Sequence, residues 1–271
     1  MTTFLLVLLA IAMLPYVMAY VYATVTFAIF PILTRGDPNP APGVRRDVLR
    51  AWAVEGAAQA WAFLVSWMHL ARSPRIVCPG IGRPIILLPG YTETAGTLWI
   101  LGRRLNALTG RPVAALNHRP GFFAGIPRLA QTATADVERV LALTGSDKAD
   151  LVGHSMGGLV SRFIVERLGK ADLIRAIVTL GTPHKGARLA HVRRGEGTRQ
   201  MRPGSSFLRE MRSAPAEGVR YASIGSLLDN IVQPVASAEG PTGEHRWFGN
   251  VAHVGLLIDP AVAREIARLL A

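Results

Sequence analysis

The sequence predicts an α/β fold: a mostly parallel sheet of about six strands with helices on both faces, preceded by an N-terminal membrane helix and an amphipathic helix. Two observations lead to this prediction. From Pro84 onward, short apolar runs typical of strands alternate with longer stretches of helical periodicity. Such alternation implies βαβ crossovers, and therefore parallel strands covered by helices on both faces. Before Pro84, long apolar segments dominate instead.

Composition excludes several classes of protein. The chain has 271 residues, of which 50% are hydrophobic, so it suits one large domain and is not intrinsically disordered. A net charge of +12 indicates contact with anionic surfaces. The single Cys78 excludes an intrachain disulfide and a Cys-rich zinc site. The seven histidines have no close metal-ligand spacing, so we expect no catalytic metal and no cofactor.

The N-terminal segment from Phe4 to Leu33 contains no formally charged residue. About 20 apolar residues are enough to cross a bilayer core. A cleaved signal peptide is the alternative, but it would need a basic region in front, and residues 1–3 contain neither Lys nor Arg. We therefore expect residues 1–34 to be an uncleaved, single-pass anchor in a membrane of the bacterial inner-membrane type. The side of the membrane on which the rest of the chain lies stays open.

Residues 35–83 are expected to form a linker and a second helix over 48–71. The polar residues of this helix fall near one face and leave a broad apolar face that carries three tryptophans. This pattern favours a helix at the membrane surface or docked onto the domain, and an ordinary buried helix is the alternative. Glu55 makes a second membrane crossing costly.

The remaining elements follow in order. Strands are expected at 84–88, 112–116, 149–153, 174–180, 219–225 and about 246–251. Helices are expected at about 97–109, 128–144, 156–169 and 260–270. Asp259 and Pro260 have the types of an N-cap and a first helical residue. Residues 185–217 interrupt the alternation and are rich in Arg, Gly and Ser, which indicates a functional or mobile insertion.

The motif with catalytic character is Gly153-His154-Ser155-Met156-Gly157. An apolar strand runs into it and an amphipathic helix runs out, which is the arrangement of a nucleophile elbow. The turn is expected to strain the backbone of Ser155, and the flanking glycines avoid clashes with the neighbouring strand and helix. His154 is expected to pack behind the turn. The alternative interpretation is a Gly-rich turn without chemistry.

A serine nucleophile needs a base and an orienting carboxylate, which follow it along the chain in that type of fold. His253 lies after the last expected strand and Asp229 lies after the strand at 219–225, so both belong to the same edge of the sheet. The weaker alternatives are His245 as base and Glu239 or Glu244 as acid. Asp150 and Asp172 precede strands and would lie at the wrong edge.

The transition state also needs hydrogen-bond donors for the oxyanion. The backbone N–H of Met156 is one candidate, because it begins the helix after the nucleophile. The loop LLPGYTETAGT follows the first central strand, and the backbone N–H of Tyr91 in that loop is the second candidate. An ordinary Pro-Gly turn is the alternative interpretation of this loop.

From Pro84 to Ala271 the chain resembles the α/β-hydrolase superfamily, specifically its compact bacterial lipase and esterase branch. The matching segments are LLPGYTETAG, LVGHSMGGLVSRF, LGTPHKGA, IGSLLDNIVQP and VAHVGLLIDP. The resemblance implies a minimal α/β-hydrolase domain over 84–271, with Ser155 as nucleophile, Asp229 as acid and His253 as base. It also implies an oxyanion hole formed by the amides of Tyr91 and Met156. The sequence departs from the family in having PGY instead of the usual His-Gly and in lacking the first one or two antiparallel strands.

Together these features predict a membrane-associated serine ester hydrolase of the lipase or carboxylesterase type, which acts on apolar acyl esters through an acyl-enzyme. An acyltransferase with the same triad and a catalytically silent membrane scaffold are the alternatives. The basic segment 185–217 is expected to be a cap or lid that contacts anionic lipids, or else a solvated insertion. No nucleic-acid partner is expected, because no recognition module is present.

Overall fold

The computed structural model describes residues 2–66, 75–121, 123–211 and 216–271. Its sheet has seven strands in the order β1-β3-β2-β4-β5-β6-β7. Their bounds are β1 (Arg75–Cys78), β2 (Ile85–Leu88), β3 (Val113–Ala115), β4 (Ala149–His154), β5 (Ile174–Leu180), β6 (Arg220–Ser226) and β7 (Glu244–Phe248). Strands β2 to β7 are parallel, whereas β1 pairs antiparallel with β3 at the edge.

The six predicted strands are therefore confirmed, and β1 is an addition. The prediction that the antiparallel strands are missing was wrong for this one strand. Its four residues are too short to give an alternating pattern, and Pro79 and Gly80 follow directly.

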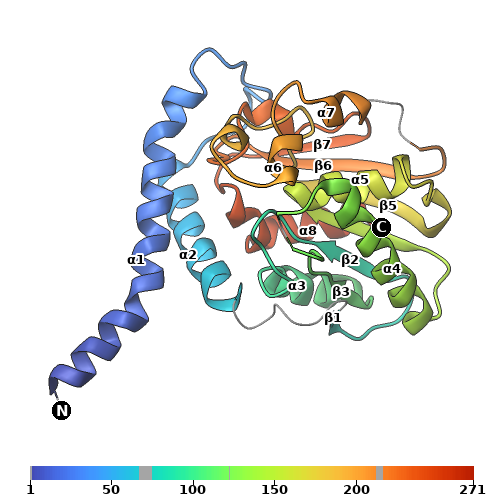
Figure 1. Ribbon diagram of the computed structural model, residues 1–271, viewed down its shortest axis with the longest axis horizontal. Helices are drawn as coiled ribbons and strands as arrows, with labels where there is room; N and C mark the ends of the chain where they lie inside the picture. The colour runs from blue at the N-terminus through green and yellow to red at the C-terminus, as the bar shows by residue number, and fades with distance from the viewer. Residues whose placement is uncertain (1, 67–74, 122, 212–215) are drawn as a thin grey trace.

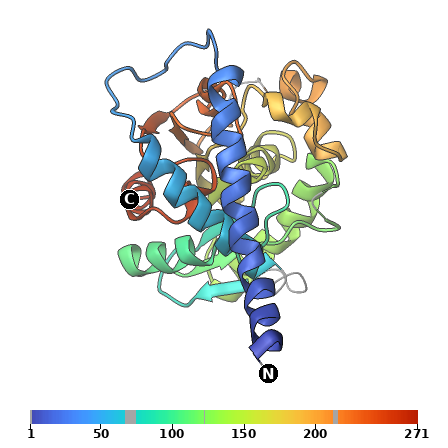
Figure 2. The same ribbon diagram turned by 90° about the vertical axis from the view of Figure 1, so that its left-hand side faces the viewer.

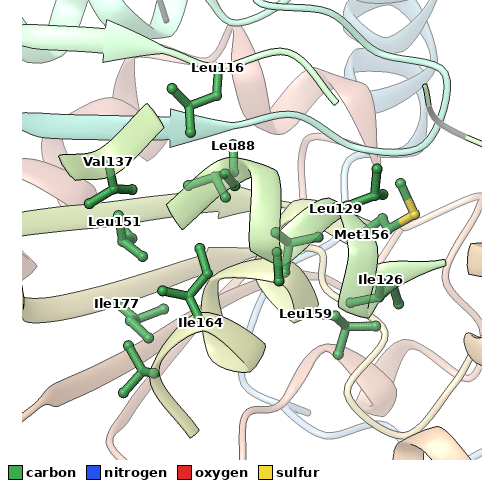
Figure 3. Close-up of a cluster of buried hydrophobic side chains, with 14 of the residues drawn as sticks. Leu88, Leu116, Ile126, Leu129, Val137, Leu151, Met156, Leu159, Ile164 and Ile177 are labelled. Atoms are coloured by element: carbon green, nitrogen blue, oxygen red, sulfur yellow. The ribbon is translucent and has the colours of Figure 1, made fainter. Parts of the chain in front are cut away.

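The main helices are α3 (Trp99–Thr109), α4 (Ile126–Thr144), α5 (Met156–Glu166) and α8 (Pro260–Leu269). Helices α4 and α5 cover one face of the sheet, and their apolar side chains interlock with those of the central strands (Figure 3). Helices α3 and α8 cover the other face around a second buried cluster. The carboxylate of Asp259 accepts hydrogen bonds from the backbone N–H groups of Ala261 and Val262, which confirms it as the N-cap of α8.

Helices α1 (Thr2–Leu33) and α2 (Val48–Ser66) lie together along one side of the domain, with α2 next to the domain and the N-terminal part of α1 projecting beyond it (Figures 1 and 2). The contact between them is tight, because a Cβ at Gly56 would lie 2.3 Å from the ring of Tyr20. Residues Tyr16–Leu33 of α1 are long and apolar enough to cross a membrane, as in a membrane anchor or a signal sequence. The expected continuation of α2 over 67–71 lies outside the described residues.

Helix α2 is docked onto the domain with its polar face inward. Glu55 is fully buried, and its carboxylate accepts a hydrogen bond of 2.9 Å from the N–H of Gly255 in η4 (Val254–Leu257). Phe63 and Leu64 are instead about half exposed, at 50% and 48%. The polar Glu55 of this helix thus contacts the domain, whereas Phe63 and Leu64 form part of the outer surface.

The described part of the segment 185–217 forms short helices that continue the core over α4 and α5. Phe207, Leu208 and Met211 belong to the same buried cluster as the central strands. The described helices of this part are η2 (Arg188–His191), α6 (Glu196–Gln200) and α7 (Ser206–Glu210). The remaining 3-10 turns of the described chain are η1 (Ala171–Leu173) and η3 (Val235–Ala238).

Candidate active site

Ser155 lies in a strained turn between β4 and α5. Its φ is +52° and its ψ is −120°, a backbone conformation that non-glycine residues rarely adopt. A Cβ at Gly153 would lie 2.5 Å from the backbone of Gly158, and one at Gly157 would lie 2.4 Å from the carbonyl oxygen of Leu88. The strain at the serine and the steric need for glycine are both as the sequence predicted.

Asp229 and His253 come from separate loops and meet in the interior. Asp229 Oδ2 lies 2.8 Å from His253 Nδ1, and the carboxylate is fully buried. Asp229 Oδ1 accepts hydrogen bonds from the N–H groups of Ile231 at 2.9 Å and Val232 at 2.7 Å. The carboxylate is therefore fixed from both sides, and it orients the imidazole so that Nε2 is left for another partner.

Ser155 and His253 line the same cavity, which has a volume of about 580 Å³. This volume is within the usual range of small-molecule sites, roughly 300–1,000 Å³. No hydrogen bond between Ser155 Oγ and the ring of His253 is present among the described residues. Catalytic hydrogen bonds are often long without substrate and tighten in the substrate complex, so the predicted pairing of Ser155 with His253 remains a prediction.

The loop after β2 approaches Ser155 closely. A Cβ at Gly90 would lie 3.1 Å from Cβ of Ser155, so only glycine permits this approach without displacement. Thr92 has a φ of +64°, a second strained backbone beside the serine. Tyr91 lines the cavity, and Met156 begins α5 directly after the serine. The two predicted oxyanion donors thus lie on the two elements that flank Ser155, and their role remains a prediction.

The partner of His154 is Glu93, which was not predicted from the sequence. A carboxylate oxygen of Glu93 lies 2.9 Å from His154 Nδ1, and His154 Nε2 lies 3.1 Å from the carbonyl oxygen of His253. Burial alone would lower the pKa of His154, but the charge and hydrogen bond of Glu93 raise it above its ordinary value. Burial opposes ionisation of Glu93 too, yet His154 holds the pKa of that carboxyl below its usual range.

Glu93 also fixes the loop that faces the nucleophile. Its Oε2 accepts a hydrogen bond of 2.6 Å from the N–H of Gly90. No local spacing joins Glu93 to His154 in the sequence, because the two are 61 residues apart. The one feature of the sequence that could have indicated Glu93 as a partner is its place as an acidic residue in the PGYTETAG segment, directly after an expected strand.

The alternative acids and bases have other partners. His245 Nδ1 pairs with Ser223 Oγ on the neighbouring strand. The acidic candidates occupy ion pairs or the surface: Asp150 with Arg111 and Arg175, Glu239 with Lys185, Glu244 with Arg246 and Arg268, and exposed Asp172 in η1. The structure therefore brings Asp229 and His253 to the cavity of Ser155 and leaves these alternatives elsewhere.

Two further histidines are held as neutral side chains. Burial lowers the pKa of His184 well below its ordinary value, and its ring contacts Arg162 and Thr179. Burial also lowers the pKa of His118 to about 4, and its Nε2–H donates to the carbonyl of Pro89. Neither histidine lines the cavity that holds Ser155.

Besides Ser155, His253 and the loops beside them, the cavity has walls from α1, α2 and the segment after β5. Helix α1 contributes Met18, Ala19 and Tyr22, and α2 contributes Gln59, Ala62 and Phe63. The segment after β5 contributes Ala187, Leu189, Ala190, Arg193, Thr198 and Met201. The walls are mainly apolar, which suits an apolar ligand. In the part of the chain that the structure describes, no three His, Cys, Asp or Glu side chains form a group suited to a metal ion.

Known proteins of similar sequence and structure identify the fold of this chain. A family model described as the alpha/beta hydrolase fold matches residues 83–200. A lipase of Bacillus licheniformis superposes with a TM-score of 0.60 over 72% of this chain and 95% of its own, at 16% identity. The domain has the α/β-hydrolase fold. Lipase B of Aspergillus fumigatus is similar to this chain in fold, with a TM-score of 0.59 over 85% of this chain and 59% of its own, at 20% identity.

The chain also resembles curated proteins over a short segment. Triacylglycerol lipases of Pseudarthrobacter phenanthrenivorans and Burkholderia plantarii are each 45% identical to it over 56 residues. One of Vibrio cholerae is 39% identical over 61 residues. Each match covers 21% or 22% of this chain, and it spans less than a fifth of each lipase, at 17%, 15% and 19%. The resemblance to lipases and esterases that the sequence indicated is confirmed at the level of this fold.

Proposed function

We propose that the protein is a membrane-associated serine hydrolase that cleaves carboxylic esters with apolar acyl chains. The observation that carries this proposal is a strained Ser155 in one mainly apolar cavity with His253, whose ring is held by the buried carboxylate of Asp229. Similarity to triacylglycerol lipases in sequence, and to lipases in fold, supports the same class of substrate.

The proposed reaction has two halves. Ser155 Oγ attacks the ester carbonyl carbon while its proton passes to Nε2 of His253, and Asp229 stabilises the resulting imidazolium. The tetrahedral oxyanion accepts hydrogen bonds from the amides of Met156 and Tyr91. Collapse of this intermediate breaks the ester bond, and the leaving alkoxide takes the proton from His253. Water then repeats these steps on the acyl-enzyme, releasing the carboxylic acid and restoring the serine.

Membrane association is proposed from the N-terminal helices and the basic segment. Helix α1 supplies an apolar anchor, and the exposed Phe63 and Leu64 of α2 extend its apolar surface. Within 185–217, Lys185 and Arg188 form ion pairs with Glu239 and Asp37. The proposed contact with anionic lipid headgroups therefore depends more on exposed residues such as Arg199.

The experiment is hydrolysis of a series of p-nitrophenyl esters of increasing acyl length by the full chain, with and without anionic vesicles. We expect Ser155→Ala to abolish hydrolysis, because the nucleophile is lost. Ser146→Ala is the matched control, since Ser146 lies half-buried in the turn after α4 and outside the cavity. Hydrolysis that survives in Ser155→Ala at the wild-type rate rejects the proposal. Stimulation by anionic vesicles supports the membrane contact, and equal rates without them count against it.

A further inference from the structure

Helix α1 has one stripe that faces the hydrolase domain. Ala19, Ala23 and Thr26 are nearly or fully buried, at 7%, 0% and 5% exposure. Residues spaced three or four apart share one face of a helix, so these side chains form a continuous stripe with Tyr22. Other faces carry large exposed side chains, among them Val21 at 50%. A helix that served only as an anchor would not need a buried stripe of small and polar residues.

Two residues of this stripe, together with Met18, contact the cavity of Ser155. Ala19 and Tyr22 line that cavity directly. The hydroxyl of Tyr22 accepts a hydrogen bond of 2.6 Å from Arg193, and the guanidinium of Arg193 lies 5.6 Å from the ring centre of Tyr91. Through this chain of contacts α1 is joined to the loop that faces the nucleophile.

A second chain of contacts joins α1 to His253. The side-chain amide of Asn230 donates a hydrogen bond of 2.7 Å to Thr26 Oγ1. The amide oxygen of Asn230 accepts a hydrogen bond of 3.3 Å from the backbone N–H of His253. Asn230 is fully buried and directly follows Asp229. Removal of α1 would leave the side-chain amide of Asn230 without this partner.

The length of α1 allows one part of it to enter a bilayer while another part contacts the domain. A helix of 32 residues at about 1.5 Å per residue is about 48 Å long. About 20 residues are enough for the hydrocarbon core. If the first 20 or so residues lie in the core, Ala19 and Tyr22, which line the cavity together with Met18 and Phe63, lie at its boundary.

We propose that α1 is retained in the mature enzyme and forms the wall of its acyl-binding pocket, so that the acyl chain of a membrane-resident ester reaches Ser155 along this helix. This inference rests on the proposed ester hydrolase function and adds the location of the acyl pocket. It assigns to α1 a part in substrate selection, in addition to anchoring. Ala19 is the smallest side chain that α1 presents to the cavity, so a larger side chain at this position would narrow the pocket.

The test places a larger side chain on α1 at position 19, where it would occupy the pocket. Full-length wild type, Ala19→Trp and Val21→Trp are compared in detergent micelles on p-nitrophenyl esters of short and long acyl chains. We expect Ala19→Trp to lower the ratio of long-chain to short-chain kcat/KM about tenfold or more, because the indole occupies the space of the acyl chain. Val21→Trp is the matched control, since Val21 is exposed and does not line the cavity, and its ratio should stay at the wild-type value. An unchanged ratio in Ala19→Trp overturns the proposal.

Two further measurements distinguish a failure of the acyl-pocket proposal from a failure of the proposed hydrolase function. Labelling of Ser155 by a fluorophosphonate reports an intact site in each variant, and Ala19→Leu replaces Ala19→Trp under the same criterion if labelling is lost. Wild type that neither hydrolyses esters nor reacts with the probe refutes the proposed function instead. Intact mass of the protein purified from membranes should include residues 1–33. An active mature form that lacks them would refute the role of α1 while leaving the hydrolase function in place.

Discussion

Glu93 and His154 form a buried ion pair in which His154 directly precedes Ser155 in the chain, with 2.9 Å between a carboxylate oxygen and Nδ1. The other ring nitrogen of His154 faces the carbonyl oxygen of His253 at 3.1 Å. A carboxylate and a carbonyl oxygen only accept hydrogen bonds, so this arrangement favours a proton on both ring nitrogens, in line with the raised pKa of His154. The side chain lies between the loop at Gly90 and the loop at His253 and connects the two beside Ser155.

Glu93→Gln should leave the charge of His154 buried without its counterion. We expect the free energy of unfolding to fall by about 3–5 kcal/mol, as for other broken buried pairs. We also expect kcat to fall about tenfold to a hundredfold, because the loop at Gly90 is displaced. Chemical unfolding and ester hydrolysis measure the two effects. The matched control is Glu138→Gln, which breaks an exposed pair with Lys170 and should change stability by about 1 kcal/mol or less. Equal losses in the two variants would contradict this account.

The same pair predicts a pH window of stability. His154 has a raised pKa, so its contribution is present below the unfolded value and is lost as the pH rises through the folded pKa. Glu93 has a lowered pKa, so its contribution is present above the unfolded value and is lost as the pH falls through the folded pKa. The difference in unfolding free energy between wild type and Glu93→Gln should therefore be largest between these limits and shrink on both sides. A difference that is constant across the pH range would argue against a charged pair.

Asp229→Asn should separate catalysis from folding. An asparagine oxygen can still accept from the N–H groups of Ile231 and Val232, but the amide no longer stabilises a charged His253. We expect kcat to fall by about 10⁴-fold with little change in melting temperature. Asp259→Ala should do the opposite: it removes the N-cap of α8 and costs about 0.5–2 kcal/mol of stability, with kcat nearly unchanged. Wild-type activity in Asp229→Asn would assign the acid to another residue.

Glu55→Gln tests the buried carboxyl of α2. Burial raises the pKa of Glu55, and the hydrogen bond from Gly255 lowers it only in part. A carboxyl with a raised folded pKa binds its proton more tightly in the folded state, so the protein loses stability as the pH rises through this range. We expect the stability of wild type relative to Glu55→Gln to fall between the unfolded pKa and the raised folded pKa, and to level off above it. A relative stability that rises with pH would reverse the assigned direction.

Gly157→Ala tests the steric need for glycine in the turn. A Cβ there would lie 2.4 Å from the carbonyl oxygen of Leu88, which is backbone and cannot move aside cheaply. We expect a loss of about 1–3 kcal/mol or more in unfolding free energy, together with a displaced Ser155 and a lower kcat. The control is Gly43→Ala, where nothing lies within 4 Å of the added Cβ. Similar stability in the two variants would show that the turn has room.

Local sequence patterns are enough to predict the turn at Ser155, the strands and the order of the candidate site residues along the chain. Ser155 stands in one contiguous motif, and Asp229 and His253 follow expected strands, so parallel topology alone brings them to one edge. The pair of Glu93 and His154 has no such signature, because it joins two loops through tertiary packing. The contact of Thr26 could not be predicted either, because one hydroxyl in a long apolar run does not show that it binds Asn230. An apolar helix gives the same pattern whether it anchors the chain or lines a cavity.

The most direct test of the central claim is to locate the adduct that a fluorophosphonate probe forms with the full-length protein, by mass spectrometry of its peptides. The account predicts one phosphonylated residue, Ser155, with no adduct in Ser155→Ala and much slower labelling in His253→Gln. An adduct on another residue, or labelling of Ser155→Ala at the wild-type rate, would contradict it.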